Sequence, residues 1–455
     1  MRQHQNFVAG TVAAIIIVPL AVLFSFAVTA GRTSAGGTGG ANGAGGSISI
    51  ELGDLYVKPS KISVPQGQKV SLVVTNAGSV QHDLKVNGTD GTDLIAPGKS
   101  QTIEIGPFDG PAQAWCTVPG HKQAGMLLNI EVAGAAASNS GGGTHAMTAT
   151  QNSNNATIDA NATPAAGWKP FDPALKPAPG GTEHKITLTA EETVVEVAPG
   201  VKQQMFTFNQ QFPGPVIRAK VGDIVTVTLE NKGTMGHSID FHASKVAWND
   251  EMRTINPGES LVYQFEAKHA GAFMYHCGTA PALHHIGNGM HGAIIIDPPG
   301  LAPVDHEYIF MQSELYLGPN GEAGDLDKMM AEQFDAVVFN GYYNQYKFAP
   351  IRVEPGQRIR AWVVDDGPSE NSAFHIVGTV FDTMFKEGAY TLKPDASKGG
   401  AQALDLQPSQ GGFVEFTFDE KGFYPIVTHK FANASKGALG LFQAGDVTLA
   451  AGAGH

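Results

Sequence analysis

Cysteine is scarce in this chain of 455 residues, which contains only Cys116 and Cys277. Two cysteines in separate motifs do not make a disulfide framework, so we do not expect cross-links to hold the fold together. Charged side chains are also few, at 16% of the residues, and the formal net charge of -13 comes with no basic stripe. Because nucleic acid is bound through clustered lysine and arginine, we expect no nucleic acid partner.

Glycine and proline are abundant instead, and the aliphatic runs are short and often alternate with polar residues. Alternation with a period of two, interrupted by frequent turn residues, is typical of strands. The composition therefore favours an all-β protein. A chain of this length has room for about three domains.

The longest apolar segment lies near the N-terminus. Residues 8–30 are almost wholly apolar and follow Arg2, as expected for a helix whose N-terminus stays in the cytoplasm. The segment is long enough to span a bilayer, but Val28-Thr29-Ala30 also resembles the cleavage site of a secretory signal. Residues 1–30 are therefore predicted to be a signal peptide or a membrane anchor. In either case the rest of the chain is expected to be exported from the cytoplasm. It would then be anchored to the membrane or secreted, for example into the periplasm.

Three segments of the chain share one pattern. Each has a turn glycine, an alternating strand and then a histidine: Gly67 to His82, Gly222 to His237, and Gly356 to His375. The spacing is equal in the first two segments and longer in the third. Each segment has a later alternating strand and closes on a short motif. Strands at this interval predict Greek-key β-sandwiches, and the period is long enough for each repeat to be a whole domain.

We place these domains at residues 45–133, 168–299 and 300–449. Residues 31–44 and 134–167 are rich in small and polar side chains without a hydrophobic period, which predicts flexible linkers. No comparable linker separates the second domain from the third. These two domains are therefore expected to pack rigidly together.

Each cysteine lies in a motif that predicts a blue-copper (type 1) site. Two imidazoles and a thiolate, with a weak axial thioether, select copper for one-electron transfer. In the first domain the ligands would be His82, Cys116, His121 and Met126. The alternative is a buried cysteine near surface histidines.

In the second domain the same pattern predicts His237, Cys277, His285 and Met290 as ligands. His284 and His291 are rivals for the second imidazole. His285 is preferred because it stands as far before Met290 as His121 stands before Met126.

Strand geometry predicts a second kind of metal site on the outside of the second domain. Neighbouring side chains of a strand point to opposite faces, so His276 points outward if Cys277 points inward. Asp240 and His242 should share that outer face. His429 occupies the place of His276 in the third domain, and three neutral histidines with an open position make a catalytic metal site. The alternative is that these histidines are merely solvated.

The third domain has Lys430 where the repeat would have cysteine, so it is not expected to hold a blue copper. His375 lies in the apolar run Ala373-Phe374-His375-Ile376-Val377. It is interpreted either as a core histidine or as a proton donor beside the outer metal.

With these residues in place, residues 168–449 resemble a copper-containing nitrite reductase. The motifs that carry the resemblance are residues 236–242, 273–292 and 374–378, and the segment around Val427-Thr428-His429. The first domain resembles a small blue-copper protein of the plastocyanin and pseudoazurin kind. The resemblance implies three tandem cupredoxin-type Greek-key sandwiches after an N-terminal transmembrane or signal helix.

The resemblance also implies a role for each residue. His237, Cys277, His285 and Met290 would hold the electron-accepting type 1 copper, and His242, His276 and His429 the catalytic type 2 copper. Asp240 and His375 would position and protonate the substrate. In the family, His375 and His429 come from the neighbouring subunit of a homotrimer. Two departures are that His284 stands where the family is often apolar or aromatic, and that Lys430 follows His429 where a neutral residue is common.

The function that follows is the one-electron reduction of nitrite to nitric oxide and water, with about three coppers per chain. The copper of the first domain would be a tethered electron donor to the second domain. It would itself receive electrons from an electron-donor protein or a quinol-linked donor. One alternative is a two-domain multicopper oxidase that reduces oxygen, although the chain has no His-x-His motif to supply its three-copper cluster. The other is a non-catalytic copper protein for electron transfer.

Overall fold

The computed structural model describes residues 47–54, 56–118, 121–122, 125–133, 155–393 and 399–448. The predicted signal or anchor segment 1–30 and the linker 31–44 lie outside these residues. Within the described ranges, no helix is both long and apolar enough to cross a membrane. All of the described residues belong to one unit of the chain, which begins at Ser47.

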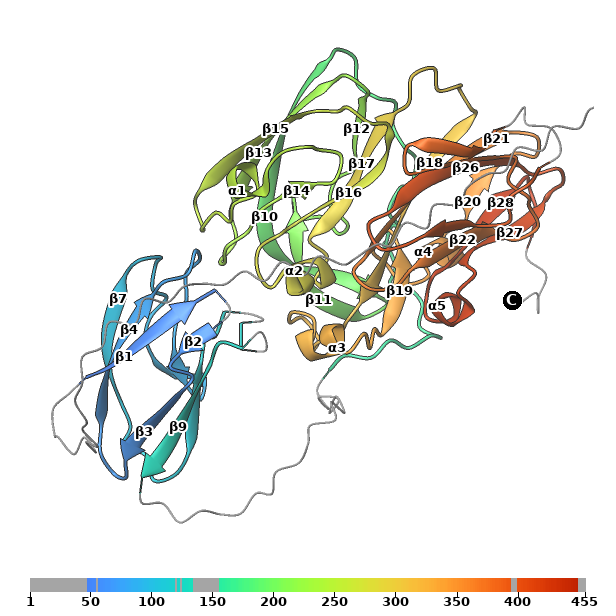
Figure 1. Ribbon diagram of the computed structural model, residues 1–455. Helices are drawn as coiled ribbons and strands as arrows, with labels where there is room; N and C mark the ends of the chain where they lie inside the picture. The colour runs from blue at the N-terminus through green and yellow to red at the C-terminus, as the bar shows by residue number, and fades with distance from the viewer. Residues whose placement is uncertain are drawn as a thin grey trace, which may run out of the picture. The chain divides into compact units, whose positions relative to one another are not determined.

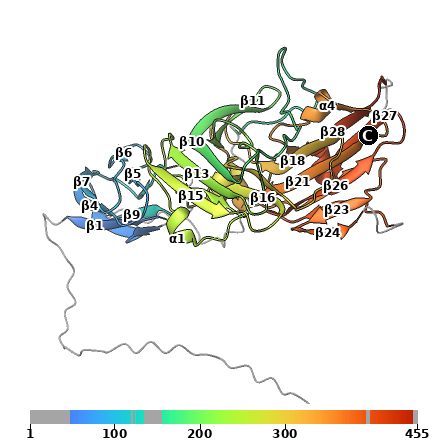
Figure 2. The same ribbon diagram turned by 90° about the horizontal axis from the view of Figure 1, so that it is seen from above.

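The described chain is built mainly from strands, which form six sheets (Figures 1 and 2). The first two sheets enclose a core that contains Leu72, Cys116 and Leu128. One has the order β2-β1-β4-β7 and the other β3-β9-β8-β5-β6. Their strands are β1 (Ile48–Gly53), β2 (Tyr56–Lys58), β3 (Lys61–Pro65), β4 (Val70–Asn76), β5 (Lys85–Val86), β6 (Asp90–Gly91), β7 (Ser100–Ile105), β8 (Ala112–Trp115) and β9 (Leu127–Ala133).

The next two sheets have the orders β11-β10-β13-β15 and β12-β17-β16-β14. Their shared core contains Val227, Tyr263 and Cys277. The strands are β10 (Glu183–Ala198), β11 (Val201–Phe208), β12 (Ile217–Lys220), β13 (Ile224–Asn231), β14 (Asp240–Phe241), β15 (Ser260–Glu266), β16 (Gly271–His276) and β17 (His291–Asp297). Burial alternates along β13 and β15, as the period of two in their sequences predicts.

The last two sheets have the orders β19-β18-β21-β26-β23-β24 and β20-β28-β27-β22-β25. Phe310, Phe374 and Phe416 lie in the core between them. The strands are β18 (His306–Leu315), β19 (Ala336–Phe339), β20 (Ile351–Val353), β21 (Arg358–Gly367), β22 (Ser372–Ile376), β23 (Thr383–Lys386), β24 (Ala389–Leu392), β25 (Leu404–Leu406), β26 (Gly411–Thr417), β27 (Gly422–Thr428) and β28 (Leu439–Ala444). The expected all-β class is confirmed.

Helices are short and lie in the connections between strands. They are α1 (Trp248–Glu251), α2 (Ala282–Gly287), α3 (Leu326–Met330), α4 (Gln345–Phe348) and α5 (Phe431–Ser435). Helix α2 matters most for the chemistry, because it carries both His284 and His285 in the connection that follows Cys277.

The second and third sheet pairs share a further apolar cluster. It joins Met274 and Ile295 of one pair to Ile309, Trp362 and Phe413 of the other. The two sheet pairs therefore pack against each other over an apolar surface, and Figures 1 and 2 show them side by side.

Part of the segment expected to be a flexible linker is instead held against these sheets. The backbone N–H of Ala156 donates to Gly318 at 2.8 Å, the Asn155 side chain donates to Asp325 at 2.7 Å, and Ile158 packs on an apolar cluster. Hydrogen bonds fix this stretch although its sequence has no hydrophobic period. Of the expected linker 134–167, residues 134–154 lie outside the described part.

Candidate metal centres

Cys277 directly follows β16, at the centre of a buried group of possible ligands. Its Sγ is 3.3 Å from Nδ1 of His285, and a ring nitrogen of His237 lies within 4.8 Å of both atoms. All three side chains and Met290 are buried. Two backbone bonds close the ligand loop: Cys277 N–H donates to Met290 O at 3.0 Å, and Met290 N–H donates to His285 O at 3.0 Å. The fold thus brings the four predicted residues of this site to one end of the second sheet pair.

The electrostatics of this group suit a metal site. Burial alone would raise the pKa of Cys277, but the imidazoles of His285 and His237 outweigh it and hold that pKa well below its ordinary value. The Ser238 backbone N–H also donates to Sγ at 3.4 Å. Nδ1 of His237 is buried and has no hydrogen-bond partner among the described residues. A thiolate beside such a nitrogen is the donor set of copper.

Cys116 has an equivalent setting in the first sheet pair. His82 Nδ1 and His121 Nδ1 are 3.2 Å apart, and Cys116 Sγ lies 3.8 Å from the former and 3.6 Å from the latter. An ion at the centre of this triangle would lie ~2 Å from each atom, close to the bond lengths of metals to nitrogen and sulfur. Met126 is buried, and its backbone bonds to Cys116 and His121 repeat those of Met290.

Protons are distributed differently in this first site. Burial raises the pKa of the Cys116 thiol to about 12. Burial, helped by the nearby His82, also lowers the pKa of His121 to about 3. The imidazole is therefore neutral and ready to bind a metal, whereas the thiol must give up a proton when the metal binds.

The outer site also comes together as strand geometry predicts. Asp240 and His276 are directly opposed on β14 and β16, and one ligand atom from each of Asp240, His242 and His276 lies within 4.8 Å of the others. Nε2 of His242 is 2.9 Å from Nε2 of His276, while His276 Nδ1 lies 3.0 Å from the carbonyl of Cys277. Burial, followed by the neighbouring His276, lowers the pKa of His242. Two imidazole nitrogens that face each other this closely suit a shared cation.

His375 and His429 lie together elsewhere in the described chain. Their ring centroids are 5.5 Å apart, and the His429 backbone N–H donates to Ala373 at 2.7 Å. His429 does not join the Asp240 group among the described residues of one chain. His375 faces out of β22, between the buried Phe374 and Ile376, and its Nδ1 contacts the carbonyl of Gln402. It is therefore not a core histidine.

The structure also places the residues that competed for these assignments. His284 Nε2 is directed to the carbonyl of Gly324 at 3.3 Å, and His291 Nδ1 to Asp366 at 2.8 Å, so His285 alone of the three joins Cys277. Lys430 pairs with Glu370. Sequence reasoning missed Asp54 and Glu192, whose carboxylates contact the Nε2 atoms of His82 and His237.

Curated relatives point to one family. A copper-containing nitrite reductase from Neisseria gonorrhoeae is 33% identical over 267 residues, which cover 56% of this chain and 67% of the relative. The chain belongs to the copper-containing nitrite reductase family. A family member from Rhizobium sullae is 28% identical over 55% of this chain and 72% of its own.

Solved structures and family models agree with this membership. The copper nitrite reductase of Nitrosomonas europaea matches with a TM-score of 0.54 and 31% identity, over 58% of this chain and 94% of that one. The enzyme of Thermus scotoductus matches at 0.52 and 30%, over 58% and 62%. Residues 189–300 match a multicopper oxidase model, and residues 16–110 a cupredoxin-like domain.

Proposed function

We propose that this member of the copper nitrite reductase family reduces nitrite, with one electron and two protons, to nitric oxide and water. The observation that carries the proposal is the adjacency of His276 and Cys277. The thiolate group lies inside the second sheet pair and the outer histidines lie on its surface, so consecutive residues belong to two ligand groups. A single peptide bond thus links an electron-accepting centre to a substrate-binding one.

The proposal includes three copper centres per chain and three cupredoxin-type domains, at residues 45–133, 168–299 and 300–449. Copper held by His242, His276 and His429 would supply an open position for nitrite and the electron. Asp240 would hydrogen-bond a substrate oxygen, because its carboxylate is 3.9 Å from His276 Nε2. His375 would donate a proton, since histidine is the commonest general acid in enzymes.

A homotrimer would complete the outer site. Within the described part of one chain, the Asp240 group has two imidazoles, while His375 and His429 form a pair of their own. A head-to-tail ring, in which each chain presents His375 and His429 to the Asp240 group of its neighbour, would supply the missing ligand.

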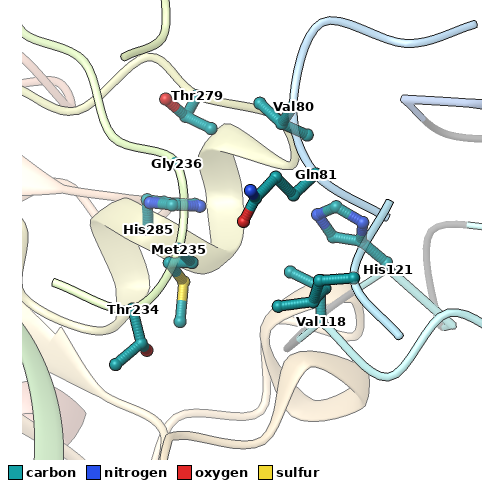
Figure 3. Close-up of a pocket in the computed structure, with 10 residues that line it drawn as sticks. Val80, Gln81, Val118, His121, Thr234, Met235, Gly236, Thr279 and His285 are labelled. Carbon is teal, nitrogen blue, oxygen red and sulfur yellow. The ribbon is translucent and has the colours of Figure 1, made fainter. Parts of the chain in front are cut away.

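The first copper is proposed to donate electrons to the second. His121 and His285 line the same cavity of about 20 Å³, together with Val80, Val118 and Gly236 (Figure 3). Gly236 allows this approach, because a Cβ there would lie 3.0 Å from a methyl carbon of Val80. Electrons would enter at Cys116 from a donor protein or a quinol-linked donor outside the cytoplasm. Unchanged turnover of Cys116→Ser with that donor would refute this relay.

The test of the main proposal is nitric oxide release from nitrite by the copper-loaded chain, without oxygen and with an artificial electron donor. We expect production that disappears in His242→Ala while the blue absorption is kept. His306→Ala is the matched control, because His306 bonds Gln357 away from all three groups. No nitric oxide despite three bound coppers would favour oxygen reduction, and two coppers would indicate an electron carrier.

A further inference from the structure

Glu192 is a buried carboxylate that contacts a predicted copper ligand from behind. Its Oε1 lies 2.9 Å from Nε2 of His237, and the Glu192 side chain is only 6% exposed. The contact occupies Nε2 of the imidazole. It leaves Nδ1, which is buried and has no hydrogen-bond partner among the described residues, for another ligand.

The loop before His237 is shaped to hold this carboxylate. Thr234 donates to Glu192 Oε2 twice, from its backbone N–H at 2.8 Å and from its hydroxyl at 3.0 Å. Gly233 leaves room for it, since a Cβ there would lie 2.7 Å from Oε1. Oε1 thus remains available to His237 while Oε2 is held by the loop.

Asp54 has a similar arrangement in the first sheet pair. Its Oδ1 lies 3.2 Å from Nε2 of His82. Ser79 donates its backbone N–H to the same Oδ1 at 2.7 Å and its hydroxyl to Oδ2 at 2.8 Å. Gly78 is again the residue that leaves room, because a Cβ there would lie 2.3 Å from Oδ1. The main difference is exposure, since the Asp54 side chain is 37% exposed.

The two carboxylates occupy the same place in the fold. In the parallel pair β1 and β4, Leu52 is opposite Asn76; in β10 and β13, Ala190 is opposite Asn231. Asp54 lies two residues after Leu52, and Glu192 lies two residues after Ala190. Each asparagine donates to one carbonyl of the loop that leads to the histidine, Val80 or Met235, and to the carbonyl of the residue opposite the histidine, Ile95 or Ile255.

The third sheet pair shows what this position does without a thiolate. Gln312 is opposite Asp365 in β18 and β21, and Glu314 follows two residues later. Its partners are the backbone N–H groups of Ser369 and Glu370 and the hydroxyl of Tyr316, in place of an imidazole. In all three sheet pairs the carboxylate therefore anchors the loop that follows the parallel strand pair. It contacts an imidazole only in the two sheet pairs that contain a cysteine.

We propose that Glu192 and Asp54 are positioning residues that set the reduction potentials of the two blue-copper centres. Each carboxylate accepts the Nε2–H of its histidine, which leaves Nδ1 to bind the metal. Its negative charge favours the cupric over the cuprous state, and more strongly for the buried Glu192 than for the exposed Asp54. The inference rests on the proposed copper sites and not on the substrate.

The test is the midpoint potential of the blue centre in the full copper-loaded chain, measured by spectroelectrochemistry. In a Cys116→Ser background, which leaves only the second blue copper, we expect Glu192→Gln to shift the cuprous-to-cupric ratio about tenfold toward cuprous, or ~59 mV upward. Glu183→Gln is the control, because it removes an equal charge from an exposed position of the same strand. In a Cys277→Ser background, Asp54→Asn should shift the first centre less.

A shift no larger than that of Glu183→Gln would overturn the proposal. If Glu192→Gln binds no copper, the deciding variant is Glu192→Asp, because it keeps the charge. This variant should recover the blue absorption. Failure to recover it would show that Glu192 only anchors the loop. This experiment measures potentials and not nitrite turnover. A protein that shows the shifted potentials but does not reduce nitrite would therefore refute the proposed function and leave this inference standing.

Discussion

The two proposed blue-copper sites are predicted to differ in how their copper affinity depends on pH. Copper binding releases one proton for each ligand that is protonated in the metal-free protein. In the first site that proton is on Cys116, with a pKa of about 12, since His121 is already neutral. In the second it is on His237: burial works against the imidazolium, but Cys277 and Glu192 outweigh it and raise the pKa to about 9.

These pKa values fix the sign and size of the effect. One released proton makes the affinity rise tenfold per pH unit, or ~1.4 kcal/mol. Both sites should therefore bind copper more tightly as the pH rises through neutrality. Above about pH 9 His237 has lost its proton, so the second affinity should level off while the first continues to rise toward about pH 12.

The assay is a Cu(I) competition titration with a chromophoric chelator, from about pH 6 to about pH 10.5. Cys277→Ser isolates the first site and Cys116→Ser the second. If the logarithm of the copper affinity had the same slope against pH at both sites above pH 9.5, this account of where the protons lie would be refuted. A second site that levels off below pH 8 would contradict the raised pKa of His237.

Three further predictions follow from the site and its support. Asp240→Asn should lose most nitrite turnover while keeping the copper content and the blue spectrum, as metal analysis and absorption would show; loss of copper would make Asp240 structural. Asn231→Ala removes two buried bonds to Met235 and Ile255 of 2.8 Å each and should cost about 2 kcal/mol of unfolding free energy, with unchanged denaturation as the contrary result. Glu307→Gln weakens bonds from Arg218 and Trp362, both 2.9 Å, and should cost about 2 kcal/mol in denaturant. The blue spectrum should remain, because Glu307 contacts neither thiolate site.

Much of the site could be predicted from the sequence because its geometry is local. Side chains alternate along a strand whatever the rest of the fold does, so His276 and Cys277 had to face opposite sides. The same alternation placed Asp240 and His242 on the outer face. The ligand loop from Cys277 to Met290 was readable for a similar reason, because residues close in sequence must return to one metal.

The carboxylates behind the histidines could not be predicted in this way. Glu192 reaches His237 only because β10 pairs with β13 in one particular register. That register depends on packing between segments far apart in the chain, and no spacing motif records it. The packed segment that begins at Asn155 was missed for the same reason, since its anchors Gly318 and Asp325 come from distant loops.

The third sheet pair indicates which features separate a copper-binding sandwich from its scaffold. It keeps the parallel strand pair and the carboxylate of Glu314, but the sequence alignment that put Lys430 at the place of the cysteine is wrong. The backbone N–H of Thr428 donates to Ala438 as that of Cys277 donates to Met290, and Ser372 is opposite Leu406 as His237 is opposite Ile255. A cysteine at position 428 alone would therefore not create a blue-copper site, because Ser372 and Ala438 stand at the places of His237 and Met290. Losing the inner ligands while keeping outward histidines leaves this pair suited to complete a metal site at its surface.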